Sequence, residues 1–162
     1  MKKVFAAIIL SALLFGMMSA CADSSSAAPA EATESLAPYE SVEGQQIRMT
    51  AGEIEVLITL NDTRSAADLA AMLPLELELI ERNGFAKGMT LPQPLSGQED
   101  TTRAYVVGDF GYWTAGPDLA IFYDDIYEQT IVEVIPLGHA EEGADEMALT
   151  SGTVRLELVS EP

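Results

Sequence analysis

The aromatic residues concentrate in one stretch, "GDFGYWTAGPDLAIFYDD", from Gly108 to Asp125, which holds the only tryptophan of the chain. Aromatic side chains with a polar tip bury apolar area and still keep one hydrogen bond, so they suit a ligand-binding surface. Such rings equally suit a hydrophobic core, and the pattern favours the core for most of them. We predict that Tyr112, Trp113 and Phe122 line a groove for a peptide or small ligand.

His139 is the only histidine and stands in "PLGHAEEG" beside two glutamates. A histidine can act as a general base or contact a substrate. No recognisable serine or cysteine nucleophile motif accompanies it, and there is no second histidine to share a zinc ion. We therefore expect an exposed or capping loop histidine, with a catalytic role as the alternative.

Two acidic segments could offer oxygens to calcium, Asp124-Asp125 and "EEGADE" over 141–146. Neither follows the spacing of a calcium-binding loop, so solvated acidic loops are the better interpretation. No glycine-rich phosphate loop, dinucleotide fingerprint or nucleophile elbow is present. We expect neither a metal nor a cofactor.

The formal net charge is −18, from 26 acidic and 8 basic residues. Nucleic-acid affinity comes largely from lysine and arginine that neutralise phosphates, so this charge argues against a nucleic-acid partner. Anionic lipid headgroups would also repel the chain.

The first residues have the pattern of a secretory signal over 1–20: a positive start, an apolar run from Val4 to Met18, and two small residues. The following "MSAC" resembles the lipobox of bacterial lipoproteins, although Met18 stands where leucine is usual. The resemblance implies that Cys21 is acylated and that the chain is cut before it. An ordinary secreted protein with an unpaired cysteine is the alternative.

Residues 21–45 are small, polar and acidic, which predicts a flexible tether. Since Cys21 is the only cysteine, the folded part has no disulfide. We expect the lipid on Cys21 to hold the protein at a membrane. We expect an extracytoplasmic location. In a cell with two membranes, this would be the periplasmic side of the outer membrane, because Ala22 and not aspartate follows the cysteine. In a cell with one membrane, it would be the outer face of that membrane.

Short alternating apolar runs predict strands over 46–50, 53–60, 75–79, 131–137 and 153–159. The aromatic stretch predicts two further strands joined at Gly116-Pro117. Gly108 and Gly111 in the first of these two indicate a bulge or a close backbone approach. One helix is predicted over 65–73, with Ser65 and Asp68 in capping-box spacing. Segments 83–103 and 138–147 are predicted loops.

The order of "LNDTRSAADLAAMLPLELEL", "GDFGYW", "GPDLAIFYDD", "VIPLGHAEEG" and "TVRLELV" resembles the cyclophilin-like fold proteins of bacteria. The resemblance covers Gln46 to Val159. It implies a mainly β domain over 46–160, a small closed barrel of about eight strands with one or two short helices. We expect this domain to be monomeric.

Cyclophilins are peptidyl-prolyl isomerases whose groove carries an essential arginine in a Phe-His-Arg segment. Here "GDF" over 108–110 matches part of the pattern, but no Phe-His-Arg precedes it and Arg103 lies in "TTRAY". A binding module of unassigned role is therefore the preferred function. The alternatives are an isomerase acting on envelope proteins through Arg103 or Arg64, and an envelope scaffold that uses the acidic surface.

Overall fold

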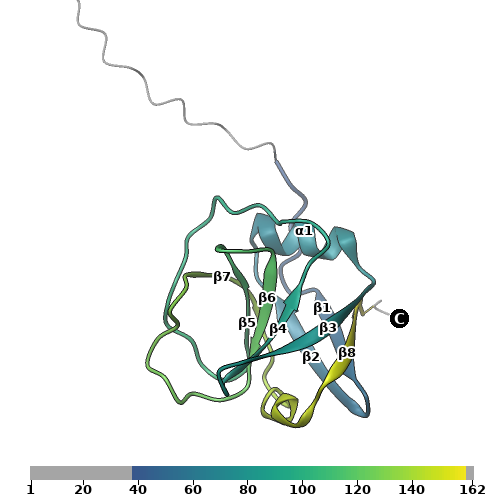
Figure 1. The fold of residues 1–162 in the computed structure, drawn as a ribbon. Helices are drawn as coiled ribbons and strands as arrows, with labels where there is room; N and C mark the ends of the chain where they lie inside the picture. The colour runs from purple at the N-terminus through teal and green to yellow at the C-terminus, as the bar shows by residue number, and fades with distance from the viewer. Residues whose placement is uncertain (1–37, 160–162) are drawn as a thin grey trace, which may run out of the picture. The chain divides into compact units, whose positions relative to one another are not determined.

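The computed structural model describes residues 38–159, in which eight strands close into an antiparallel barrel (Figure 1). The elements are β1 (Gln46–Ala51), β2 (Ile54–Leu60), α1 (Arg64–Met72), β3 (Leu75–Arg82), β4 (Ala86–Thr90), β5 (Asp109–Trp113), β6 (Asp118–Phe122), β7 (Val134–His139), the 3-10 helix η1 (Asp145–Leu149) and β8 (Gly152–Leu158). Around the barrel the order is β1-β2-β7-β5-β6-β4-β3-β8. The predicted mainly β barrel is confirmed.

The predicted signal, the lipid attachment site Cys21 and most of the tether lie outside the described residues. The end of the predicted tether lies within the described residues. Val42 is buried in the core, and the Gly44 N–H donates to the Leu60 carbonyl at 3.0 Å. The packed part of the chain therefore begins before the predicted boundary at Gln46. Between residues 38 and 159, no helix is long and apolar enough to cross a membrane.

Strict alternation places one face of each hairpin strand inside the barrel. The alternation of β2 predicts that Ile54, Val56, Ile58 and Leu60 face inward; the last three are buried and Ile54 is partly buried against the core, while the residues between them are exposed. The alternation of β3 predicts the same for Leu75, Leu77 and Leu79; Leu77 is buried, and the other two pack against the core. These predictions are confirmed, and β1 and β8 complete this side of the barrel.

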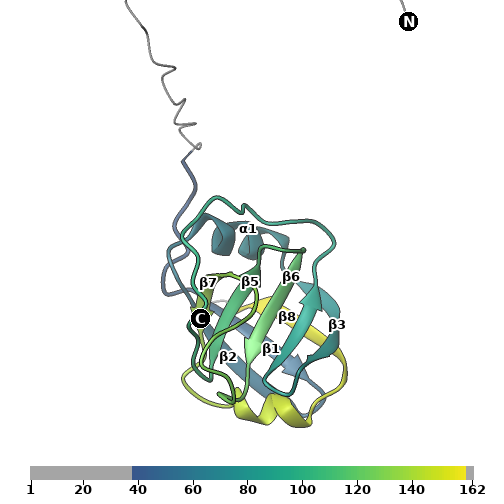
Figure 2. The same cartoon turned by 60° about the vertical axis from the view of Figure 1, so that its left-hand side comes forward.

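Helix α1 covers one end of the barrel and η1 lies at the other end (Figures 1 and 2). The predicted capping box was wrong. The N-cap is Thr63, whose hydroxyl accepts from the Ala66 N–H at 3.1 Å. Ser65 and Asp68 instead bond to the segment that follows β4: Ser65 contacts Glu99, and Asp68 accepts from the Ser96 N–H at 2.9 Å. Tertiary contacts thus replaced the local ones that the spacing suggested.

Two predicted loops contain regular structure. Strand β4 lies within the predicted loop 83–103. The sequence pattern did not indicate this strand, because Lys87 and Gly88 interrupt its apolar alternation. In the second segment, β7 continues to His139 and η1 begins at Asp145. β7 also begins at Val134, three residues later than predicted, because residues 131–133 belong to the preceding loop.

A buried lysine lies near the barrel end formed by β3, β4 and the end of β6. Lys87 is only 5% exposed, and its Nζ lies 2.7 Å from Glu81 Oε2. The Tyr123 hydroxyl donates to the other Glu81 oxygen at 2.7 Å. Burial acts to raise the pKa of Glu81, but the hydrogen bonds from Lys87, Tyr123 and the Gly84 N–H outweigh it, so the pKa lies below its usual value. Burial and the Glu81 charge raise the pKa of Tyr123 to about 12.

Both glycines predicted to mark a bulge or a close approach do so. Gly108 has φ of 98°, in the left-handed region that favours glycine. The β5–β7 register shifts between Phe110 and Gly111. A Cβ on Gly111 would lie 2.2 Å from Val134 Cγ1. The Val134 side chain of the neighbouring strand β7 therefore lies against the backbone of β5 at Gly111.

Replacing Gly111 by alanine should destabilise the barrel by about 1–3 kcal/mol, because the added methyl group overpacks the contact with Val134. The measurement is the free energy of unfolding in urea, followed by tryptophan fluorescence. Gly116→Ala is the matched control, since nothing lies within 4 Å of a Cβ there. Equal stability of the two variants would contradict this packing constraint.

Replacing Glu81 by glutamine should lower stability at neutral pH by about 1 kcal/mol, after allowance for the partial exposure of the carboxylate. Because the folded-state pKa of Glu81 is lowered, its contribution exists above the unfolded value of about 4.3 and is lost as pH falls through the folded value. The difference between wild type and variant in thermal midpoint should therefore shrink below about pH 4. A difference that stays constant down to about pH 2 would rule out this ionic contribution.

Candidate ligand-binding site

The candidate site lies on the outer face of β4, β6 and β5, where three small residues form a row across the sheet. Gly88 pairs with Ala120, and Ala120 pairs with Gly111. Small side chains leave room for other groups to lie close to the strands. A Cβ on Gly88 would lie 2.6 Å from Arg82 Nε, so the Arg82 side chain lies across this backbone. The row lets neighbouring side chains lie directly on the backbone of the sheet.

Strand β6 is buried on both of its faces. Leu119 and Ile121 belong to the barrel core, whereas Ala120 and Phe122 belong to a second apolar cluster on the outside. Tyr105, from the segment between β4 and β5, and Tyr127, from the segment after β6, lie against this outer cluster, whereas residues 96–99 bond to α1. These two segments are tied together, because the Thr130 N–H donates to the Arg103 carbonyl at 2.8 Å and Arg103 Nε donates to the Thr130 carbonyl at 2.7 Å.

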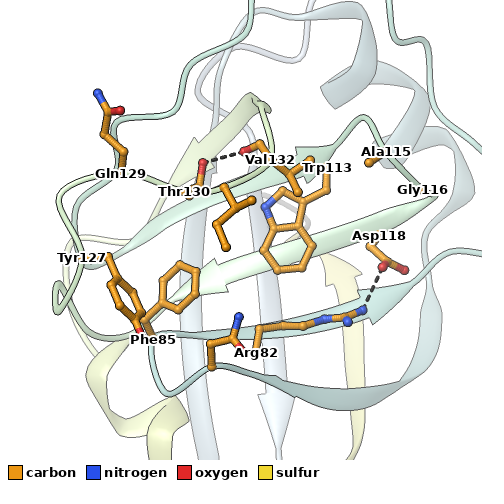
Figure 3. Close-up of a pocket in the computed structure, with 12 residues that line it drawn as sticks. Arg82, Phe85, Trp113, Ala115, Gly116, Asp118, Tyr127, Gln129, Thr130 and Val132 are labelled. Atoms are coloured by element: carbon orange, nitrogen blue, oxygen red, sulfur yellow. Dashed lines mark hydrogen bonds and ion pairs between the residues drawn. The ribbon is translucent and has the colours of Figure 1, made fainter.

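Between the sheet and segment 127–132 lies a pocket of about 460 Å³ (Figure 3). This volume is within the range of small-molecule sites. Its wall is mixed, with aromatic, aliphatic and polar side chains. The lining residues are Arg82, Asn83, Phe85, Trp113, Ala115, Gly116, Asp118, Tyr127, Gln129, Thr130, Ile131 and Val132.

Arg82 and Trp113 form one side of this pocket. Arg82 Nη2 lies 2.8 Å from Asp118 Oδ2, and the guanidinium carbon lies 5.4 Å from the centroid of the Trp113 ring. Figure 3 shows the arginine running alongside the indole toward Asp118. The other Asp118 oxygen accepts from Thr90 Oγ1 at 2.6 Å. The ion pair cancels the arginine charge, so this wall is close to neutral despite the acidic composition of the chain.

Two buried donors of this wall have no hydrogen-bond partner among residues 38–159: Trp113 Nε1 and Arg82 Nε. Leaving a buried donor unpaired costs roughly 1–3 kcal/mol. The indole nitrogen is directed toward the side of the pocket where Thr130 and Val132 lie (Figure 3). Unpaired buried polar groups are rare in folded proteins, so each one calls for an explanation such as a bound water, an ion or a functional role.

Aromatic rings form the other end of the pocket and continue beyond it. Phe85 lies with its ring centroid 5.3 Å from Tyr127 and 5.7 Å from Phe122. Tyr105 stacks on Phe122 with a centroid separation of 4.6 Å. Phe85 and Tyr127 line the pocket at Trp113, which is the larger of the two cavities beside this aromatic cluster and is called the large pocket. Tyr105 and Phe122 line the smaller one, a separate cavity of about 180 Å³.

The three predicted groove residues therefore lie in three places. Trp113 lines the large pocket, Phe122 lines the smaller cavity, and Tyr112 is buried in the barrel core. The reason is the alternation of β5, which directs Tyr112 inward and its neighbour Trp113 outward. The sequence interpretation grouped rings by proximity along the chain and did not separate the two faces.

The predicted arginines and the histidine lie outside the large pocket. Arg64 begins α1, with its guanidinium carbon 5.2 Å from the centroid of the Tyr39 ring. Arg103 is exposed and reaches this pocket only through its bond to Thr130. His139 ends β7 and does not lie in a loop; it pairs with Asp109 and borders the smaller cavity.

Sequence reasoning missed Arg82, which is the arginine that lines the pocket. It stands in "IERNGF" at the end of β3, where the chain turns through Asn83, which has φ of 54°. The available signal was an arginine immediately before an Asn-Gly turn. Its partners Asp118 and Trp113 come from the next hairpin, so the pairing could not be read from local sequence.

Nothing among residues 38–159 gathers three or more histidine, cysteine or acidic side chains in a geometry that could hold a metal ion. Asp125, Glu141 and Glu142 are exposed loop residues.

Residues 49–159 match the model of the cyclophilin-like family. The solution structure of the hypothetical protein AF2241 from Archaeoglobus fulgidus is similar, with 16% identity and a TM-score of 0.62 over 74% of this chain and 98% of that one. The structure of McbB in complex with tryptophan is also similar, with 16% identity and a TM-score of 0.59 over 72% of this chain and 46% of McbB. No curated protein matches the chain. Because the family model spans most of the barrel, the chain belongs to the cyclophilin-like family.

Proposed function

We propose that this cyclophilin-like domain is a binding module for a neutral small ligand or short peptide that places an apolar or aromatic group against Trp113. The observation that carries the proposal is the pocket of about 460 Å³ beside Trp113, whose buried indole N–H has no partner among the described residues. A ligand with a hydrogen-bond acceptor at that edge of the ring would satisfy this donor once the side chains that cover the indole nitrogen move aside.

The rim of the pocket supports an apolar ligand group. Ile131 is 84% exposed and Tyr127 is 50% exposed, and both residues line the opening. Neighbouring apolar residues left exposed around a concave site are a common mark of binding surfaces. The paired charges of Arg82 and Asp118 favour a neutral ligand over an ionic one.

The similarity to McbB is consistent with a ligand of this size, because that structure contains tryptophan. At 16% identity the likeness concerns the fold, so no residue of McbB is transferred to this chain. The proposal depends on the pocket of this chain alone.

We further propose that the module is carried at the cell envelope by a lipid on Cys21, with residues 21–37 as part of the tether. Its support is the "MSAC" sequence after an apolar run. Acyl chains contribute roughly 0.8 kcal/mol per buried CH₂, so several chains on one residue would anchor the domain without a spanning helix.

The binding proposal predicts that an acetylated and amidated Ala-Pro-Phe peptide shifts the indole N–H resonance of the full chain in a saturable way. Since Trp113 is the only tryptophan, one ¹H–¹⁵N signal reports on the pocket directly. Trp113→Ala should weaken binding about 30-fold, the effect of losing roughly 2 kcal/mol at an anchor residue, measured by line broadening of the peptide signals.

Tyr39→Ala is the matched control, because this exposed aromatic residue lies beside Arg64 and outside the pocket. Retained peptide binding in Trp113→Ala would sink the proposal. The same spectra measure cis/trans exchange of the Ala-Pro bond. Acceleration that disappears in Arg103→Ala or Arg64→Ala would instead establish the isomerase alternative.

The anchoring proposal predicts that the full chain, expressed in a bacterium fed an alkyne analogue of palmitate, incorporates the label. Cys21→Ser should remove the label completely, since acylation requires the thiol and no other cysteine is present. The readout is in-gel fluorescence after attachment of a dye to the alkyne. Equal labelling of the serine variant would exclude Cys21 as the attachment site.

A further inference from the structure

A second cavity, of about 180 Å³, lies at the end of the aromatic cluster away from Trp113. Tyr105, Phe122 and Val134 supply apolar wall, and Asn61 and Thr102 supply polar groups. Asp109 and His139 complete the wall. An apolar cavity of about 150 Å³ can hold benzene, so this cavity has room for a single six-membered ring.

Asp109 and His139 form a cross-strand pair between β5 and β7. The His139 Nδ1 lies 2.9 Å from Asp109 Oδ1. The other carboxylate oxygen, Oδ2, accepts from the Val106 N–H at 2.9 Å. An ionised carboxylate can only accept hydrogen bonds, so Nδ1 of the neutral ring must carry the proton. Nε2 is then an acceptor.

The Nε2 acceptor is available. Nε2 has no hydrogen-bond partner within the part of the chain that the structure describes, and the His139 side chain is 38% exposed. The backbone at Gly108 lies close to this ring. A Cβ on Gly108 would lie 2.8 Å from His139 Cε1 and 2.3 Å from the Ala140 carbonyl oxygen. Gly108 also has φ of 98°, so glycine is required there for two independent reasons.

A histidine that is oriented by a carboxylate, whose second nitrogen is unpaired and whose ring lines a cavity, is an arrangement that can accept protons in general-base sites. Nothing in the large pocket uses this pair. We propose that the cavity is a second ligand site, in which His139 Nε2 accepts a hydrogen bond from the hydroxyl group of a small phenol-like molecule whose ring lies against Tyr105 and Phe122. Asp109 is the positioning residue, since it holds the acceptor tautomer without touching the ligand.

The chain offers an unusually direct test because His139 is its only histidine. The full chain, ¹⁵N-labelled and purified without a histidine tag, gives one pair of imidazole ¹⁵N signals. At about pH 8 the free protein should show Nδ1 protonated and Nε2 unprotonated. Phenol should move the Nε2 signal in a saturable way. Toluene, which has the ring without the hydroxyl group, should leave the Nε2 signal in place.

Two alanines provide matched variants. Ala104 lines the small cavity and Ala115 lines the large pocket, and both are exposed loop residues. Ala104→Met should fill the small cavity and raise the apparent Kd for phenol by about tenfold or more, while the tautomer of His139 is unchanged. Ala115→Met should leave the phenol response as in the wild type.

A purely structural Asp109–His139 pair would give the same tautomer but no response to phenol up to its solubility limit, and that result would overturn the proposal. An equal Nε2 shift with toluene, or a proton on Nε2 in the free protein, would overturn it as well. The Ala-Pro-Phe peptide experiment reports on Trp113, whereas the phenol experiment reports on His139. Either proposed site can therefore be disproved without affecting the other.

Discussion

The structure depends on the close approach of side chains to bare backbone on the outer face of β4, β6 and β5. Gly88 and Gly111 flank Ala120, and the space that Cβ atoms would occupy is taken by Arg82 on one side and Val134 on the other. This row lets an arginine cross a strand and lets β7 pack against β5 at the bulge. Arg82, which this row allows to lie across the sheet, is one of the residues that line the pocket at Trp113.

Strand β6 is apolar at every position after Asp118. Its inner residues fill the barrel, and its outer residues belong to a second apolar cluster together with Phe85 and Tyr105. Sheets covered on both faces are typical of buried strands, and here long loops provide the second layer in place of helices. The aromatic rings of that layer separate the large pocket at Trp113 from the small cavity at His139.

The charge at the two cavities differs from the acidic character of the chain as a whole. The chain carries a formal charge of −18, yet Arg82 is neutralised by Asp118 at the large pocket, and Asp109 is engaged by His139 and a backbone N–H at the small cavity. The charged side chains that line these two cavities are thus paired with one another. Lys87 and Glu81 form a further ion pair near the barrel end, in which the Glu81 carboxylate is exposed to solvent and Lys87 is buried.

The sequence by itself determined the mainly β class, the alternating faces of β2 and β3, and the aromatic hairpin with its two special glycines. These follow from period-two patterns and from turn residues, which are local properties. Only the tertiary structure decided that Tyr112 lies inside and Trp113 outside, that Arg82 is the arginine of the pocket, and that Asp109 faces His139. Each of these pairings joins residues at least 30 positions apart or depends on strand register, as with Arg82 and Asp118 or Asp109 and His139. Such contacts are set by closure of the barrel, and no local pattern specifies them.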